Sequence, residues 1–210
     1  SGTAYTSFTN TVSDGWRDHS SARRALINAG VTGSLGDKTK VAVYATGANN
    51  LSHLPGALTQ AQYDADPTQA NATYAARDER RYNRVLRLGA TIDHQLGANA
   101  SVSSMVFVNP KYLQRSERNT FRDFTRYHVG GNIVGRLQAG RNSFTAGIDE
   151  AFQDGAIMFY SLVNGGRGPT TTANKGEGAN NTGAFAQDEI ALGARALLTV
   201  GGRYDNVSDY

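Results

Sequence analysis

The chain has 210 residues, which is enough for one domain with a core. Its 21 Lys and Arg against 18 Asp and Glu give a net charge of only +3, and the basic residues are dispersed, which argues against a nucleic-acid-binding protein. The absence of cysteine excludes disulfides and thiolate metal sites. No run of about 18 apolar residues predicts a transmembrane helix, but barrel strands alternate their faces and need no such run.

Hydrophobic periodicity predicts strands. From Arg81 to Leu96 one alternate set of residues is mostly apolar and the other mostly polar, which is a period of 2 over about sixteen residues. Strands of soluble proteins usually run about 3–10 residues, so this length favours a strand that crosses a membrane and continues beyond it. In chain order, the sequence predicts nine strands at about 3–12, 22–35, 40–47, 80–96, 100–113, 124–138, 143–163, 182–192 and 197–210.

The connections between these strands alternate in length. Four are short and rich in turn-forming residues (36–39, 97–100, 139–142 and 193–196), and four are long and polar (13–21, 46–79, 114–123 and 164–181). Outer-membrane barrels sort short periplasmic turns from long external loops in this way, and they place aromatic girdles at the membrane interfaces. Tyr82, Tyr127 and Tyr204 fall near predicted strand ends. The alternative is a soluble all-β protein with long hairpins.

Several segments resemble TonB-dependent receptors for ferric siderophores. Gly183-Ala-Phe-Ala-Gln-Asp-Glu-Ile190, followed by Leu197-Leu-Thr-Val-Gly-Gly-Arg-Tyr-Asp205, is similar to a strand pair of that family, with Phe185 and Gly202 as departures from its pattern. Leu54-Pro-Gly-Ala-Leu-Thr59 and Ser13-Asp-Gly-Trp-Arg-Asp-His-Ser20 resemble external loops of its ferric-citrate-type members.

The resemblance implies a location in the bacterial outer membrane and an all-β fold, an antiparallel transmembrane β-barrel. Nine strands in lipid would leave open edges, and each unpaired backbone group in hydrocarbon costs several kcal/mol. We therefore expect residues 1–210 to be part of a larger barrel, one of 22 strands, with the plug domain and TonB box of the family absent from this sequence.

The implied function is uptake of a ferric siderophore or similar iron chelate, with the TonB complex acting through a plug. Outer-membrane lipid and lipopolysaccharide would surround the barrel, and no nucleic acid is expected as a partner. The alternatives are a passive porin-type barrel and a soluble β-rich binding protein. A plug domain encoded upstream would distinguish the receptor hypothesis from the porin hypothesis.

Enzyme motifs are absent from the sequence. There is no phosphate-binding Gly-x-x-x-x-Gly-Lys-Ser/Thr loop, no His-Glu-x-x-His and no Gly-x-Ser-x-Gly. His19, His53, His94 and His128 do not cluster at metal-ligand spacing, since zinc needs three or four convergent ligands. We expect no catalysis, no resident metal and no cofactor.

Ligand binding is the remaining kind of site. A ferric siderophore is often anionic, and arginine offers a planar fork of donors that suits carboxylates. The alternative for each residue is an ordinary solvated position in a loop or in the barrel lumen. The candidates lie in the external loops or on upper lumen faces: Trp16, Arg17, His53, Tyr74, Arg77, Arg80 and Arg81.

Overall fold

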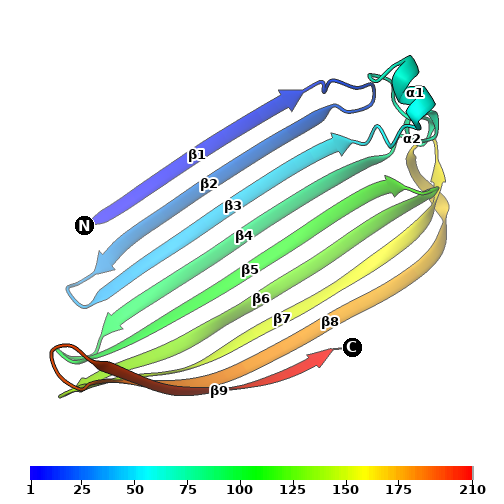
Figure 1. Cartoon of the computed structure of the whole chain (residues 1–210). Coiled ribbons are helices and arrows are strands. Elements are labelled where there is room, and N and C mark those ends of the chain that lie inside the picture. Colours follow the sequence, from blue (N-terminus) through cyan, green and yellow to red (C-terminus); the bar gives the residue numbers. More distant parts are fainter. Residues whose placement is uncertain (210) are drawn as a thin grey trace.

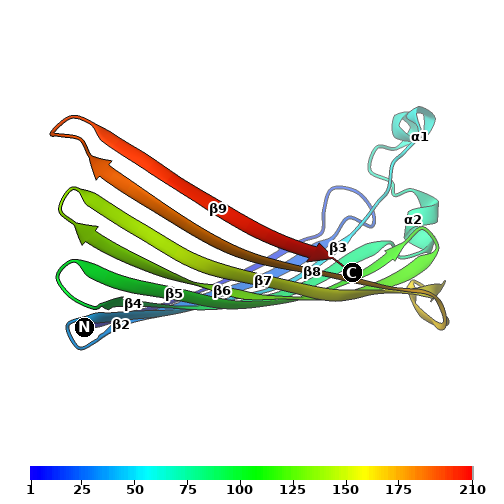
Figure 2. The ribbon, with the colours of Figure 1, turned by 90° about the horizontal axis from the view of Figure 1, so that it is seen from below.

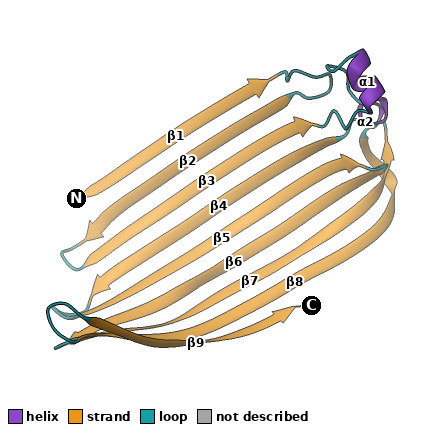
Figure 3. Cartoon of the chain, viewed as in Figure 1, coloured by secondary structure: helices purple, strands orange, loops and turns teal. Residues whose placement is uncertain are grey.

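The computed structural model describes residues 1–209 and forms one antiparallel sheet of nine strands in the order of the chain (Figure 1). Figure 2 shows that the sheet is curved, and that two short helices rise from it on the side toward which edge strand β9 bends. Both helices lie at the same end of the sheet (Figure 3). No helix among the described residues has the length and apolar character needed to cross a membrane.

The nine strands predicted from alternation are all present, and several are longer than predicted. Their bounds are β1 Gly2–Ser13, β2 Ala22–Leu35, β3 Thr39–His53, β4 Arg80–Gln95, β5 Ala100–Glu117, β6 Thr120–Ala139, β7 Asn142–Val163, β8 Gly166–Ala191 and β9 Leu197–Asp209. The helices, α1 Gln60–Ala65 and α2 Ala72–Ala76, were not predicted.

The register of the strands gives the sheet two chemically different faces. Directly paired residues share a face, so Val31, Val43, Ala90 and Val106 form one apolar row across β2 to β5. Residues of the other parity form polar rows, in which, for example, Thr46 Oγ1 donates to Asn28 Oδ1 at 2.9 Å. We call the two surfaces the apolar face and the polar face.

The two ends of the sheet differ as predicted, with one correction. At one end every connection is short, and Gly36 and Gly140 take positive φ values of 67° and 60° in these turns. At the other end, the predicted long loops 114–123 and 164–181 are wrong, because β5–β6 and β7–β8 continue as paired strands to two-residue turns. Both residues of each turn have positive φ, which are 52° and 64° at Arg118 and Asn119, and 50° and 73° at Asn164 and Gly165. This pattern is the type I′ hairpin turn.

Few side chains are fully enclosed, because the sheet is a single layer. Packing on the polar face instead places aromatic rings over glycines of neighbouring strands. A Cβ added to Gly130 would lie 2.7 Å from the Phe107 ring, and one added to Gly30 would lie 2.4 Å from the Tyr5 ring. Each pair favours the observed strand register, because the aromatic ring covers the backbone of a glycine that has no side chain of its own.

Tyrosines on the apolar face mark a level near the helical end of the sheet. Tyr112 lies twelve residues from Ala100, and Tyr127 lies twelve residues from Ala139, both at the short-turn end. At about 3.3 Å per residue and a tilt of about 40°, this is roughly 30 Å, the thickness of a bilayer core. The two hydroxyls are hydrogen-bonded at 2.9 Å. Tyr204 was also predicted near a strand end. It lies only seven residues from Leu197, so it is closer to the short-turn end than the level of Tyr112 and Tyr127.

Candidate functional site

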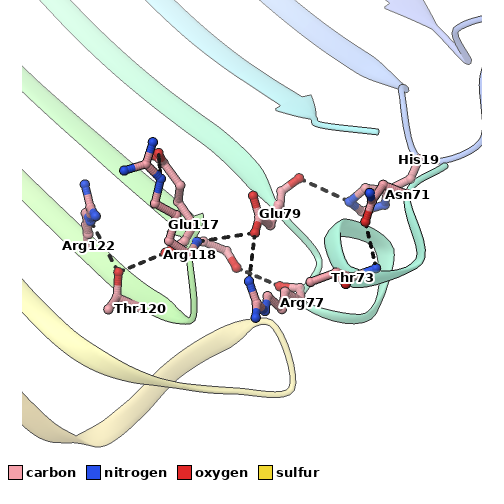
Figure 4. Close-up of polar contacts among 10 residues, drawn as sticks. His19, Asn71, Thr73, Arg77, Glu79, Glu117, Arg118, Thr120 and Arg122 are labelled. Carbon is pink, nitrogen blue, oxygen red and sulfur yellow. Dashed lines mark hydrogen bonds and ion pairs between the residues drawn. The ribbon is translucent and has the colours of Figure 1, made fainter. Parts of the chain in front are cut away.

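Three connections meet at the helical end of the sheet, and Glu79 joins them (Figure 4). Its side chain is 2% exposed, and its Oε1 accepts from the backbone N–H of Arg118 at 3.3 Å and lies 3.7 Å from Arg77 Nη1. The Glu79 carbonyl oxygen lies 3.1 Å from His19 Nε2 and accepts from Leu54 N at 2.8 Å. Glu79 therefore ties the 14–21 and 54–79 connections to the β5–β6 turn.

The helical connection is shaped by its capping residues. Thr59 and Gln62 form a reciprocal capping box at the start of α1, and Asn71 Oδ1 accepts from Thr73 N at 3.0 Å at the start of α2. Gly56, with φ of 73°, packs against the ring of Tyr74 so closely that an added Cβ would lie 2.5 Å from it. Tyr74 is thus part of the packing that gives this connection its shape.

Arg17 and Trp16 are neighbours with different surroundings. Arg17 donates from Nε and Nη2 to the carbonyl of Gln69 at 3.1 and 2.9 Å, and from Nη1 to the carbonyl of Gly56 at 2.8 Å. Its guanidinium therefore holds the helical connection to the 14–21 connection. Trp16 is 68% exposed and borders an open hollow whose other side is formed by Leu58, Thr59, Gln60, Tyr63 and Pro67.

His53 belongs to a cluster of charged groups under the helices. Its Nδ1 lies 3.0 Å from Ser21 Oγ, its ring centroid is 5.0 Å from that of His19, and its Nε2 is 3.6 Å from Asp78. Asp78 is itself paired with Arg80. Burial, and then the charge of His19, lower the pKa of His53 below its ordinary value of 6.5, and Arg80 and Arg23 act in the same direction. His53 and Arg80 therefore support the base of the loops.

Arg81 lies on the polar face, beside two arginines that the sequence did not single out. Arg81 pairs with Arg115 across β4–β5, and Arg115 pairs with Arg122 across β5–β6. We call these three residues the arginine row. The acidic group that reaches it within residues 1–209 is Glu117, whose Oε2 is 3.4 Å from Arg115 Nη1.

The arginine row is electrostatically costly to the sheet by itself. Like charges on directly paired strand positions destabilise a sheet. Burial, and then the charge of Arg81, lower the pKa of Arg115, although a guanidinium still stays protonated. Stacking offsets part of the cost, since Arg115 lies 5.6 Å from the Phe124 ring centroid and Arg122 lies 5.1 Å from that of Phe159. Such an arrangement suits an anionic ligand.

A hollow next to the arginine row extends this basic surface. Arg126 of β6 reaches over Gly155 of β7 to Glu177 of β8, with Nη2 2.6 Å from Oε2. Lys111 pairs with Arg126 and lines the same hollow, whose apolar surface includes Leu113, Phe124 and Ile157. The sequence missed Arg115 and Arg122 because they fall within a segment predicted as a loop, where a residue has no assigned face.

A protein-family model described as "TonB dependent receptor-like, beta-barrel" matches residues 3–210. The chain belongs to this family. It therefore forms part of an outer-membrane β-barrel of the TonB-dependent receptor type, and this finding replaces the soluble alternative. A search of the curated proteins finds no match.

Several solved structures share the fold at low identity. The unliganded ferric citrate transporter FecA superposes with a TM-score of 0.77 at 16% identity, covering 100% of this chain and 33% of that chain. FpvA of P. aeruginosa, bound to a heterologous pyoverdine and iron, gives 0.74 at 14%, with coverage of 100% and 33%. The copper transporter OprC gives 0.71 at 14%, with 99% and 33%. The chain thus spans about a third of the length of these three proteins.

Proposed function

We propose that this barrel segment belongs to a receptor that takes up an anionic iron chelate, a ferric siderophore of the ferric-citrate type, across the outer membrane. The proposal rests on the arginine row. Its three positive charges have one acidic neighbour on the polar face, so an anionic ligand would offset their repulsion. The polar face would line the lumen of a barrel of about 22 strands. A plug domain of the same protein would couple to the TonB complex.

The predicted site residues take different parts in this proposal. Arg81 would contact the ligand together with Arg115 and Arg122, and Trp16 would contact it from the open hollow above. The residues whose polar groups or rings are already engaged would hold the loops in position: Arg17, His53, Tyr74, Arg77 and Arg80. Anion-selective pores also carry rings of arginine and lysine, so a plug domain in the intact protein is the feature that would distinguish the receptor from a passive porin.

Copper is the second candidate cargo, since OprC shares the fold. Copper ions favour thiolate, thioether and imidazole ligands, whereas guanidinium groups suit carboxylates and other anions. The chemistry of the arginine row therefore favours the anionic chelate over the free metal ion.

The test is equilibrium binding of radiolabelled ferric citrate to the intact protein in purified outer membranes. We expect Arg115→Gln and Arg122→Gln each to weaken binding about tenfold, because each removes a charge-assisted contact. Arg118→Gln is the matched control, because its guanidinium lies on the same hairpin but is 80% exposed at the turn. Equal affinity for all four proteins, or saturable binding of Cu²⁺ with none of ferric citrate, would overturn the proposal.

A further inference from the structure

Glu150 of β7 places a carboxyl group on the apolar face. It pairs with Gly131 of β6, which pairs in turn with Val106 of β5, so the three residues share that face. Its neighbours on the same face of β7 are Ile148 and Phe152, which are both exposed, and Glu150 itself is exposed. The side of the sheet that contacts hydrocarbon therefore carries an acidic side chain between two apolar ones.

Glu150 lies closer to the short-turn end than the tyrosines do. It is eight residues from Asn142 at that end, whereas Tyr127 is twelve residues from Ala139. At about 3.3 Å per residue and a tilt of about 40°, this difference places Glu150 roughly 10 Å below the tyrosine level. An acidic side chain at this depth in a bilayer is costly unless another group pairs with it.

The described part of the chain satisfies this carboxyl group only in part. The hydroxyl of Thr182 donates to Glu150 Oε2, and within residues 1–209 no Lys, Arg or His lies within ion-pair distance of Glu150. Glu150 borders a hollow with a largely apolar surface, which also includes Val106, Gly131 and Ile133. An apolar wall with an acidic rim fits an arginine, because the arginine stem is apolar and its head is cationic.

An arginine at a matching height lies elsewhere on the apolar face. Arg84 of β4 pairs with Tyr112, is exposed, and lies eleven residues from the short-turn end of its strand. Asp154 shares the face of Glu150 on β7, is also exposed, and lies twelve residues from that end. In height, Arg84 therefore falls between Glu150 and Asp154. Among residues 1–209, neither Arg84 nor Asp154 has an oppositely charged group within ion-pair distance.

We propose that Glu150 and Asp154 of one copy of this chain bind Arg84 of a second copy within the outer membrane. The surfaces around β4 and β7 face different directions on the curved sheet (Figure 2), so the contact joins two different surfaces head to tail. A two-fold contact of the β7 surface with itself would place acidic groups opposite each other, and like charges oppose association. Charge complementarity therefore selects the head-to-tail arrangement.

A head-to-tail contact gives either a closed ring or an open filament, depending on the rotation between copies. In a barrel of about 22 strands each strand covers about 16°, so β4 and β7 point about 50° apart. The two neighbours of a copy in a ring of three lie about 60° apart, so the contact closes into a trimer. The inference takes the size of the barrel from the proposed function but not the cargo, so its failure would leave the iron chelate untouched.

The first experiment cross-links the intact protein in outer membranes with a short thiol-reactive bifunctional reagent. The 210 residues contain no cysteine, so introduced thiols report on the contact. We expect Glu150→Cys/Arg84→Cys to give dimer and trimer bands, because the two positions meet only between copies. Glu150→Cys alone and Arg84→Cys alone should stay monomeric, whereas a two-fold contact would cross-link one of them.

The second experiment measures the trimer fraction of the detergent-purified protein by native mass spectrometry. Glu150→Arg/Asp154→Arg and Arg84→Glu should each lower it at least about tenfold, because like charges then meet. Combining the three substitutions reverses both surfaces and should restore the trimer. Arg87→Glu is the matched control, because Arg87 is an exposed arginine on the polar face of the same strand, and it should leave the trimer intact.

Other results would overturn the proposal. They are a monomeric wild type both in membranes and in detergent, cross-linking by Glu150→Cys alone, an equal loss of trimer in Arg87→Glu, or a combined variant that stays monomeric. Retention of the heat-resistant barrel band in gel electrophoresis establishes that each variant is folded.

Discussion

Arg203 of β9 donates to both carboxylate oxygens of Asp149 on β7, with Nη1–Oδ2 2.7 Å and Nη2–Oδ1 2.8 Å, although β8 lies between them. The residue under the bridge is Gly183, and a Cβ there would lie 2.1 Å from Arg203 Nη2. The same Arg203 also contacts Asp205 on its own strand. Glycine in the middle strand is therefore what lets the ion pair span three strands.

Gly183→Ala should lower the temperature at which the barrel loses its heat-resistant form by a few degrees, because the added methyl displaces the guanidinium from Asp149. Gly202→Ala, in the same hairpin, is the control, since a Cβ there meets nothing within 4 Å. Heat-dependent mobility in gel electrophoresis measures both. An equal shift in the two variants would show that the glycines matter only for backbone freedom.

Gly130→Ala should destabilise the sheet, because its Cβ would lie 2.5 Å from the Glu150 carbonyl and 2.7 Å from the Phe107 ring. The expected cost is about 1–3 kcal/mol, typical of overpacking. Gly89 occupies the same register row, paired with Phe107, yet its Cβ would be 3.7 Å from its nearest neighbour. Gly89→Ala should therefore cost much less in a denaturant titration followed by circular dichroism.

Glu79→Ala should free the external connections while leaving the barrel intact, because Glu79 accepts from the Arg118 backbone and is buried. The loss of a buried hydrogen-bond partner costs about 1–3 kcal/mol. Limited proteolysis of the protein in outer membranes should cut between residues 54 and 79 faster. Gln60→Ala, exposed on α1, should be cut at the wild-type rate, and equal rates for all three would refute the role of Glu79.

The external connections should loosen in mild acid through His53. Its pKa is lowered in the folded state, so the unfolded loop binds the proton more tightly, and stability is lost as pH falls through and below 6.5. Asp78 lies 3.6 Å away and favours the charged form, but its pairing with Arg80 weakens this opposing effect. Proteolysis between pH 7.5 and 5 should accelerate in the wild type. His53→Asn should flatten this pH dependence, and an unchanged profile would exclude His53 as its source.

Much of the fold was predictable because lipid imposes alternation. The strand around Leu86 and Ile92 shows the period of 2 clearly, since one face must be apolar wherever hydrocarbon contacts it. Beyond Tyr112 and Tyr127 both faces can be polar, so the outer parts of β5, β6 and β8 look like loops in the sequence. One signal was present, because Asn164-Gly165 is a strong pattern for a type I′ hairpin turn.

The candidate site was harder to predict than the sheet. Arg81 could be placed on a polar strand face, but its neighbours Arg115 and Arg122 depend on the register set by the turn at Arg118 and Asn119. Helices of five and six residues, such as α2 and α1, carry almost no periodicity, and the capping pair Thr59 and Gln62 was the available signal.

The two-residue turns at 118–119 and 164–165 have a mechanical consequence. In β5–β6 the ladder of backbone hydrogen bonds continues without interruption up to the turn, so this hairpin is stiff, whereas the β7–β8 ladder shifts register between Phe159 and Leu162 before its turn. The connections at 14–21 and 54–79 are held instead by a few side chains, chiefly Arg17 and Glu79. We therefore expect any closure over a ligand to come from movement of the 14–21 and 54–79 connections on the β1–β4 side, while the β5–β6 hairpin stays in place.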